Sequence, residues 1–376
     1  MSKIKYHFNT CISYYSLAAM YSFLLVSRNI DAILGEPTLH QRRTKLDRMI
    51  GGQGLGDPYA EIVSRVRTQQ GSRSKLGMQV LMWISHSERP LHVDELCHAL
   101  GVEEGSTDLN IRNTPAIETL LACSLGLVTL DKSSLTVHLV HYTLQEYLSH
   151  NLDFFPNPHS RIAEVCLTYL NFREVRGISP TLHSVPQTVP FVEYASCHWG
   201  THAKRETTER VKALALKLLD GYDKHISSKV LLLRGMSIGG RPFDRKDCPT
   251  GFTGLHGAAY FGCLDITVAL LEMGKWDARE ADFDGKTAVA WASRRGHEEV
   301  VRILLEWSDV NPARPNKYGQ KLVLRGVQNA DDGIAQLPWD QADFVHRSTP
   351  SLLPTKLFSP QPSEPSEPPF KRTRRF

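Results

Sequence analysis

The chain of 376 residues has few of the features that mark specialised protein classes. Its seven cysteines are an odd number without any C-x-x-C pair, which argues against a disulfide framework or a zinc ribbon. Its formal net charge is only +4, too small to indicate nucleic-acid binding by itself. Hydrophobic residues make up 41% and charged residues 22%, as in ordinary globular proteins. Composition therefore excludes collagen, a coiled coil, a wholly disordered chain and a multi-span membrane protein, and favours a cytoplasmic protein with reduced thiols.

One apolar stretch resembles a targeting signal. Residues 11–26 are apolar and follow Lys3 and Lys5, as in a secretory signal peptide. The stretch is short and rich in hydroxyl groups for a transmembrane helix, and no A-x-A cleavage site follows it. The favoured alternative is a buried helix over residues 14–34, and we expect no membrane association.

Residues 75–150 have the element order of a winged helix. Apolar residues recur at helical spacing in three segments, and two segments of strand type follow them. Thr114 and Pro115 form the predicted start of the third helix. The predicted elements are helices over 76–86, 93–100, 114–124 and 143–150, with strands over 125–131 and 135–141.

Helical segments lie on both sides of this region. Residues 1–70 are predicted to be mainly helical, with Tyr59, Ile62, Val63 and Val66 on one buried face. Residues 160–235 are predicted to form a helical bridge towards the next domain, interrupted by a loop over 176–190.

Residues 250–330 contain an internal repeat. Four residues recur at an offset of 34, and each unit is predicted to contain a turn followed by two helices. A period near 33 residues is typical of ankyrin repeats. The matching pairs are Thr253/Thr287, Gly262/Gly296, Leu270/Leu304 and Leu271/Leu305. A third unit begins at Tyr318 and then loses the pattern, so the sequence predicts two complete repeats and a degenerate one. So few units must pack on the preceding helices or be only marginally stable.

The last segment, residues 345–376, is polar, rich in proline and predicted to be disordered. Residues 354–376 carry five basic and two acidic side chains, which is +3 of the net charge of +4. The rest of the chain is therefore almost neutral. The end of the tail, residues 371–375, also resembles a nuclear-import cluster, so the nucleus is the alternative to the cytoplasm.

The order of these segments, and several of their sequence stretches, resemble those of a known protein family. The stretches LGMQVLMWISHSERPLHVDELCHAL and VHLVHYTLQEYL resemble the winged-helix segment of fungal NACHT–ankyrin proteins. These are signal-transduction NTPases similar to NLR immune receptors, and their winged helix is similar to that of GPI inositol-deacylase-like proteins. The stretches FLLVSRNIDAIL and RRTKLDRMIGGQGLGDPYAEIV, within the predicted helical remnant 1–70, resemble the last helices of a NACHT module, and YASCHWGTHAK resembles the helical region after the wing. The resemblance covers residues 20–235 and implies a truncated form, because the nucleotide-binding front half of the family is absent from this sequence.

Motifs for catalysis are incomplete. Gly285-Lys286-Thr287 ends like a P-loop, but position 280 is Glu where the first glycine belongs, so we expect no nucleotide. Residues 235–239 match the G-x-S-x-G nucleophile elbow, with Ser237 after a candidate strand over 230–233. Gly240 and Pro242 break the helix that should follow this serine. We therefore expect no enzyme and no cofactor, with a lipase-like hydrolase as the disfavoured alternative.

Two further motifs suggest a metal or DNA. Cys197, His198 and His202 could ligate a metal, but no fourth ligand is near in sequence. The favoured alternative is a helix with Cys197 buried and the histidines partly exposed, so we expect no metal. The third helix of the winged-helix segment carries Glu118 and no Lys or Arg, and the wing offers only Lys132. This argues against DNA binding, which needs cations facing phosphates.

The repeats are the best candidate for function. In the ankyrin pattern, partners meet the turns and the exposed end of each first helix, and aromatic and arginine side chains are common interface anchors. The predicted partner-binding residues are Phe252, Tyr260, Phe261, Asp282, Phe283, Asp284, Trp291, Arg294 and Arg295. Packing against the neighbouring repeat is the alternative for Tyr260 and Trp291.

The sequence as a whole predicts a mainly α-helical, non-enzymatic protein-interaction module whose partners are other proteins. Its predicted parts are the NACHT-like helices, a winged helix, a helical bridge, a short ankyrin array and a disordered tail. The alternatives are a DNA-binding winged-helix protein and a gene fragment without function.

Overall fold

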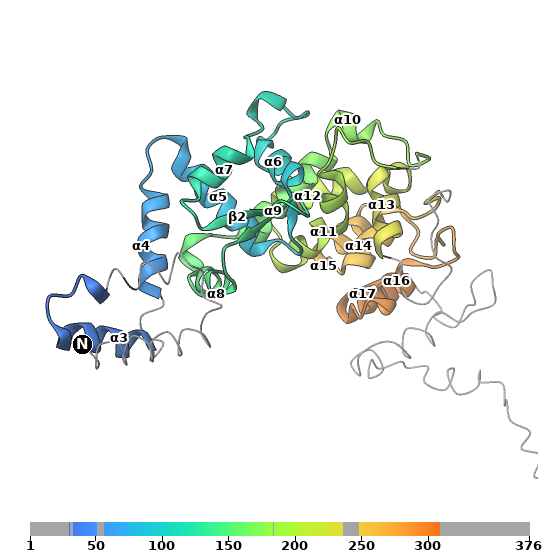
Figure 1. Cartoon of the computed structure of the whole chain (residues 1–376). Helices are drawn as coiled ribbons and strands as arrows, with labels where there is room; N and C mark the ends of the chain where they lie inside the picture. Colours follow the sequence, from blue (N-terminus) through green and yellow to red (C-terminus); the bar gives the residue numbers. More distant parts are fainter. Residues whose placement is uncertain (1–29, 31–32, 51–55, 183, 236–247, 309–376) are drawn as a thin grey trace, which may run out of the picture. The chain divides into compact units, whose positions relative to one another are not determined.

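The structure is a computed structural model that describes residues 30, 33–50, 56–182, 184–235 and 248–308 (Figure 1). The predicted fold class, mainly α-helical with a small β-sheet, is confirmed. The predicted signal-like segment 11–26, the degenerate third repeat from Tyr318 and the tail 345–376 lie outside the described residues. Within the described part, no helix is long and apolar enough to cross a membrane.

Two helices precede the predicted winged-helix segment. They are α3 (Leu39–Ile50) and α4 (Gly56–Arg67). Thr38 precedes α3, and its hydroxyl oxygen accepts a hydrogen bond from the Gln41 amide at 3.2 Å. The predicted buried face of α4 is confirmed, because Tyr59, Ile62, Val63 and Val66 are all at most 2% exposed.

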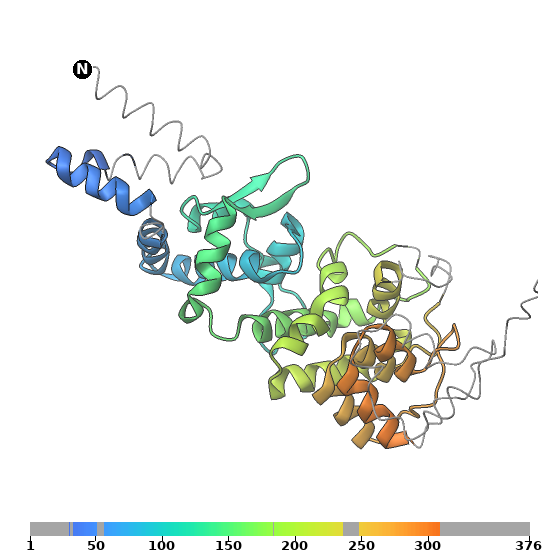
Figure 2. The same ribbon diagram turned by 90° about the horizontal axis from the view of Figure 1, so that it is seen from below.

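The next segment has the order helix, helix, helix and hairpin. The sheet has the order β1-β3-β2 with antiparallel pairs, and in Figure 2 the β2–β3 hairpin projects from the helices around it. The two residues of β1, which sequence periodicity did not predict, pair with the first two residues of β3. The elements are α5 (Ser72–His86), β1 (Leu91–His92), α6 (Val93–Gly101), η1 (Ile111–Asn113), α7 (Ile117–Cys123), β2 (Val128–Asp131), β3 (Thr136–Leu139) and α8 (Tyr142–His150).

The start of α7 differs from the prediction. Thr114 does not cap this helix, because residues 111–113 form a 3-10 turn that ends at Thr114, whose amide donates to the Ile111 carbonyl. The helix begins two residues after Pro115, with Ala116 at its N-cap. Its buried side is Leu120 with Cys123, while the predicted Ile117 and Leu121 are only half-buried.

A group of helices follows, in which α9 and α11 pack closely together. Aromatic rings join this group to α5: the Trp83 ring lies 5.7 Å from Phe191 and 6.2 Å from Tyr194. The elements are η2 (Leu152–Phe154), α9 (Pro158–Leu170), α10 (Arg173–Arg176), α11 (Val192–Arg205), α12 (Glu209–Leu219), η3 (Tyr222–Lys224) and α13 (Ile226–Gly235). The candidate strand over 230–233 is not formed, because these residues belong to α13, which packs on α11.

Two helical hairpins form the repeats. Their helices are α14 (Gly254–Phe261), α15 (Leu264–Glu272), α16 (Ala288–Arg294) and α17 (Glu298–Ser308). Helix α14 packs on α16, and α15 packs on α17, as stacked repeats require (Figures 1 and 2). Gly262 and Gly296 both have φ of 74°, so the turn between the helices uses the left-handed conformation that favours glycine in both units.

The repeats also pack on the preceding helices, as the small number of units predicts. A Cβ atom on Gly257 would lie 2.7 Å from the ring of Tyr222, and one on Gly200 of α11 would overlap the ring of Phe261. The Cys263 thiol donates a hydrogen bond to the Gly200 carbonyl at 3.3 Å. Helix α12 contacts both α14 and α15. The first repeat is therefore covered on the side that would otherwise face a preceding repeat.

Candidate functional site

The structure buries five of the nine predicted partner-binding residues. These five are at most 4% exposed: Phe252, Tyr260, Phe261, Asp282 and Trp291. The Trp291 ring lies 5.4 Å from Phe252 and 5.7 Å from Tyr260, so one repeat packs on the other through these rings. Tyr260 and Trp291 therefore pack between the neighbouring repeats, as the alternative prediction for them stated. Burial likewise makes Phe252, Phe261 and Asp282 part of the core and not direct partner contacts.

Asp282 holds the turn of the second repeat together. Its Oδ1 accepts hydrogen bonds from the amides of Asp284 at 2.9 Å and Lys286 at 2.8 Å. Its Oδ2 accepts one from the indole Nε1 of Trp291 at 2.8 Å. This buried carboxylate thus satisfies three donors, and it fixes the turn to the helix behind it.

His256 links the first repeat to the turn of the second repeat through hydrogen bonds. Its Nε2 donates towards the carbonyl oxygens of Glu280 at 3.2 Å and Lys286 at 3.1 Å, while its Nδ1 accepts from Thr253. Burial lowers the pKa of His256, in keeping with a neutral ring that links two backbone segments. Ala290 stands at the matching position of the second repeat, so this repeat has no such ring.

Four predicted residues remain accessible and form what we call the turn-side surface. Phe283, Asp284 and Arg294 are half-buried, and Arg295 is exposed. The guanidinium of Arg295 lies 4.3 Å from the centroid of the Tyr260 ring, a cation–π geometry that restricts the arginine side chain. The ammonium of Lys286 pairs with Asp284 and lies 5.2 Å from the Trp291 ring. Buried aromatic rings thus position the charged groups of this surface.

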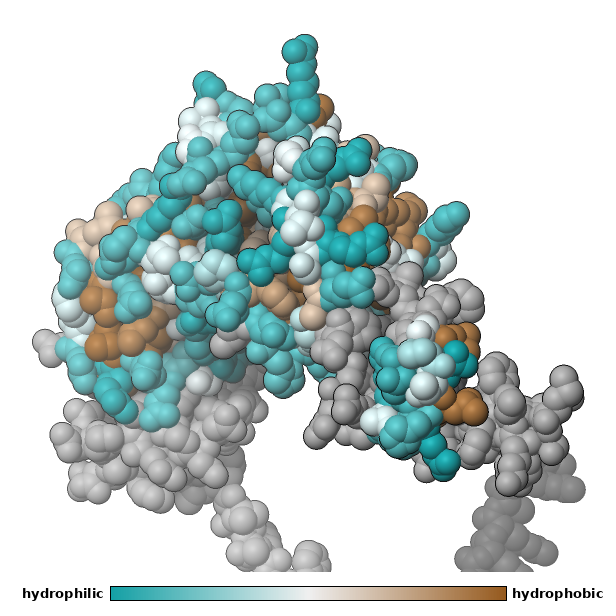
Figure 3. Space-filling view, turned by 90° about the vertical axis from the view of Figure 1, so that its left-hand side faces the viewer, coloured by the Kyte–Doolittle hydropathy of each residue, from teal (hydrophilic) through white to brown (hydrophobic). Residues whose placement is uncertain are grey.

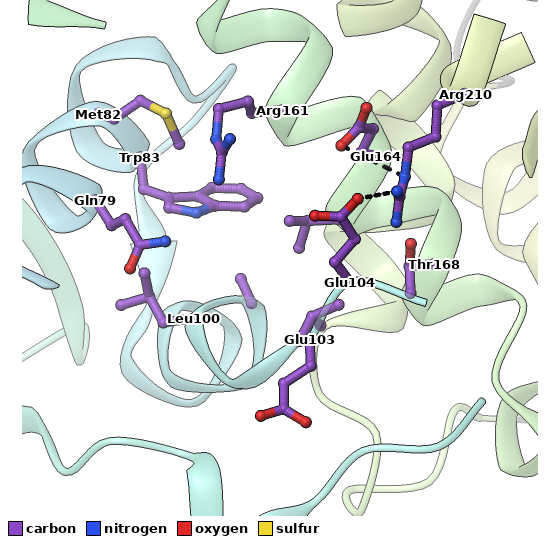
Figure 4. Close-up of a pocket in the computed structure, with 13 residues that line it drawn as sticks. Gln79, Met82, Trp83, Leu100, Glu103, Glu104, Arg161, Glu164, Thr168 and Arg210 are labelled. Atoms are coloured by element: carbon purple, nitrogen blue, oxygen red, sulfur yellow. Dashed lines mark hydrogen bonds and ion pairs between the residues drawn. The ribbon is translucent and has the colours of Figure 1, made fainter. Parts of the chain in front are cut away.

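A small cavity of about 90 Å³ lies between α5, the end of α6, α9 and α12 (Figure 4). Trp83, Met82 and Leu100 give it an apolar wall, and Arg161 points into the same space (Figure 4). Arg210 pairs with Glu104 and lies 3.8 Å from Glu164, which connects α12 to the turn after α6. The cavity is smaller than the roughly 150 Å³ that holds a benzene molecule, so it is too small to enclose a substrate of ordinary size.

The predicted metal motif is part of a buried histidine cluster. His202 is fully buried, and its Nδ1 lies 2.8 Å from Nδ1 of His159, while its Nε2 lies 3.0 Å from the Tyr194 hydroxyl. Cys197 and His198 are half-buried, so the expectation of a buried cysteine and partly exposed histidines is wrong for Cys197 and for His202. Among the described residues, no group of three or more His, Cys, Asp or Glu side chains has a geometry that could hold a metal ion.

Burial sets the charge state of this cluster. It lowers the pKa of His202 to about 2 and that of His198 to about 4, with the nearby Arg205 and Arg89 contributing in the same direction. It also lowers the pKa of His86, whose ring lies 5.5 Å from that of His159. At neutral pH these rings are uncharged, and they pack helices α5, α9 and α11 together.

The winged-helix segment does not present a basic surface through its third helix. The exposed positions of α7 include Glu118, Thr119 and Ala122, and none of its residues is basic. At the tip of the hairpin, Asp131 accepts hydrogen bonds from Ser133 and Ser134, which lowers the pKa of its carboxyl to about 2. A carboxylate at the wing and a glutamate on the helix would repel a phosphate backbone.

The remaining motifs do not form the sites that their patterns describe. Ser237 lies outside the described residues, and the segment before it is helix α13, whereas a nucleophile elbow follows a strand. Lys286 of the Gly-Lys-Thr tripeptide lies in the turn of the second repeat, where its ammonium is engaged by Asp284. A phosphate would have to displace this carboxylate.

The described surface is mixed in character. The face in Figure 3 is largely hydrophilic, with separate hydrophobic patches. The large hydrophobic side chains that are at least 38% exposed are Ile30, Leu34, Leu39, Ile111, Leu135, Tyr142, Leu182, Met273 and Trp307.

Comparison with known families gives two matches. Residues 66–163 match the winged helix domain of GPI inositol-deacylase. Residues 209–316 match ankyrin repeats, in a family model of three copies. The chain therefore contains a winged-helix domain of this type and ankyrin repeats, which are non-catalytic protein-interaction modules. The ankyrin match begins at Glu209, the first residue of α12, and so includes helices that the sequence analysis assigned to the bridge.

Proposed function

We propose that this chain is a non-enzymatic protein–protein interaction module that binds its partner through the turn-side surface of its ankyrin repeats. The observation that carries the proposal is the placement of Arg295 on the ring of Tyr260, in the same repeat unit whose turn leaves Phe283 and Asp284 accessible. Arginine and aromatic side chains at a pre-organised surface are the usual anchors of interfaces.

The proposed context is that of a fungal NACHT–ankyrin protein of NLR-like type, without nucleotide binding in this chain. The order of a GPI inositol-deacylase type winged helix followed by ankyrin repeats supports this context. The sequence has Glu280 where a P-loop needs glycine, which supports the lack of a nucleotide switch. A cytoplasmic location fits the free thiols of the described residues.

Charge reversal on the turn-side surface tests the proposal. The full chain with Asp284→Lys and Arg295→Glu should lose its specific partners in an affinity purification, because both side chains are accessible and their loss leaves the core intact. The matched control is Asp108→Lys with Arg173→Glu, an exposed ion pair outside the repeats.

The outcomes separate the alternatives. Loss of the same partners in the turn-side variant alone supports the proposal. Identical partners in the wild type and the turn-side variant would overturn it. A gel shift with random duplex DNA that weakens with salt and with Lys132→Ala would instead favour the DNA-binding alternative.

A further inference from the structure

Two exposed apolar side chains occupy the same position in the two repeats. Met273 and Trp307 are separated by 34 residues, the offset of the repeat, and each is 54% exposed. Met273 is the C-cap of α15, and Trp307 lies in the last turn of α17. Because α15 and α17 pack on each other and the two residues are equivalent, their backbone positions should lie about 10 Å apart, the usual spacing of packed helix axes. An exposed tryptophan next to an exposed methionine is an uncommon surface for a soluble domain.

Carboxylates repeat at the same offset on these helices. Asp265 and Glu272 of α15 correspond to Glu299 and Glu306 of α17, and all four are exposed. Within the described residues, none of the four has an ion-pair partner within 4.0 Å. Arg302, the only basic residue in the sequences of α15 and α17, pairs with Glu298 at 3.6 Å. Two carboxylates without an ion-pair partner therefore precede each apolar side chain on its helix, one of them immediately before it.

We call this set the outer repeat surface; it comprises Asp265, Glu272, Met273, Glu299, Glu306 and Trp307. It lies on the second helix of each unit, whereas the turn-side surface lies on the turns and on the first helices. The two surfaces also differ in charge, because the turn-side surface carries Arg294 and Arg295.

We propose that the outer repeat surface binds a basic amphipathic helix of a partner protein. Apolar anchors about 10 Å apart match residues i and i+7 of a helix, which rises about 10.5 Å over seven residues. Lysine or arginine residues beside these anchors then meet the unpaired carboxylates that precede Met273 and Trp307 on α15 and α17. The partner helix crosses α15 and α17, and it covers Met273 and Trp307 together. This second contact is independent of the proposed turn-side interaction.

The test measures binding of a designed peptide to the full chain. The probe is a fluorescein-labelled peptide that, as a helix, has one face of arginine and lysine and one face of leucine. Anisotropy should show binding that weakens with added salt, and tryptophan emission should shift to the blue as Trp307 leaves water. A peptide of the same pattern with glutamate in place of the basic residues should not bind. The formal net charge of the chain is +4, so overall attraction does not favour the basic peptide.

Two pairs of substitutions locate the binding. Met273→Ser with Trp307→Ser, and separately Glu272→Lys with Glu306→Lys, should each weaken binding about tenfold or more. The matched controls replace other exposed side chains outside this surface: Ile111→Ser with Leu182→Ser, and Glu118→Lys with Glu146→Lys. The controls should bind like the wild type, and unchanged circular dichroism and thermal midpoint should show that all variants fold.

Three results would overturn the proposal. One is wild-type affinity in both surface variants. Another is an equal loss in the controls, which would mean binding without a defined site. The third is self-association of the wild type that is abolished by Trp307→Ser, together with a failure of the peptide to bind. The surface would then bind a second copy of the chain. The turn-side variant Asp284→Lys with Arg295→Glu should bind the peptide normally. A failure of peptide binding therefore does not affect the proposed turn-side interaction.

Discussion

Phe261 of α14 packs directly on Gly200 of α11, so closely that a Cβ atom on the glycine would overlap the phenyl ring. The Trp199 ring lies 4.9 Å from the same phenyl ring, and the Cys263 thiol bonds to the Gly200 carbonyl. This contact joins the first ankyrin hairpin to the helices before it. It makes the lack of a side chain at position 200 a requirement of the interface.

Gly200→Ala should therefore lower the free energy of unfolding by about 1–3 kcal/mol, since the added methyl forces the buried ring of Phe261 to move. Urea unfolding followed by circular dichroism measures the change. Gly221→Ala is the control, because no atom lies within 4 Å of a Cβ placed there. An equal effect of the two substitutions would show that the close approach does not matter.

The bond between Asp282 and Trp291 should stabilise the second repeat. Asp282→Ala should cost about 1–3 kcal/mol, because it leaves a buried indole N–H and two turn amides without their acceptor. Trp291→Phe removes the indole donor together with part of the buried ring, so its cost also includes lost packing against Phe252 and Tyr260. A double-mutant cycle of the two substitutions isolates their coupling, and a coupling near zero would contradict the role assigned to this bond.

Stability should fall as the pH drops below about 6.5. His202 has a folded-state pKa of about 2, far below the ordinary value of 6.5, so the unfolded chain takes up its proton first. The stability that the neutral ring provides is complete above pH 6.5 and is lost at up to about 1.4 kcal/mol per unit as the pH falls. His198, with a pKa of about 4, adds to this loss down to about pH 4.

Urea midpoints measured between pH 7 and pH 5 check this dependence. His202→Gln should flatten the slope, because a glutamine keeps hydrogen-bonding capacity towards Tyr194 without taking up a proton. His150→Gln, at an exposed position, is the control and should keep the wild-type slope. A slope unchanged by the first substitution would remove the cluster as the cause.

Much of the fold follows from apolar spacing in the sequence. The face of Tyr59, Ile62, Val63 and Val66 was predictable because helical periodicity and burial coincide there. The two residues of β1 were not predictable, since so short a strand has no alternation. Residues 230–233 were ambiguous, because a short apolar run fits a strand or a buried helix equally well.

The site was less predictable than the fold. Phe252, Tyr260 and Trp291 occupy positions that face partners in the ankyrin pattern, but here their rings pack on each other across two hairpins. His159 lies 43 residues before His202, so no local sequence motif could predict the contact between their rings. The pair Met273 and Trp307, in contrast, has a clear sequence signal, which is two apolar residues at the repeat offset shortly after the core leucines of each unit.

The contacts of Gly254, Gly257 and Phe261 with α11, α12 and η3 also determine which helices must accompany the ankyrin array when it is transferred to another protein. A fragment that starts at residue 248 would expose the apolar side of α14 to water. Helices α11 and α12 act as the end cap that long arrays build from a dedicated repeat. The smallest portable unit of this array therefore includes α11, and any recombination that grafts the repeats onto another protein has to carry that helix with them.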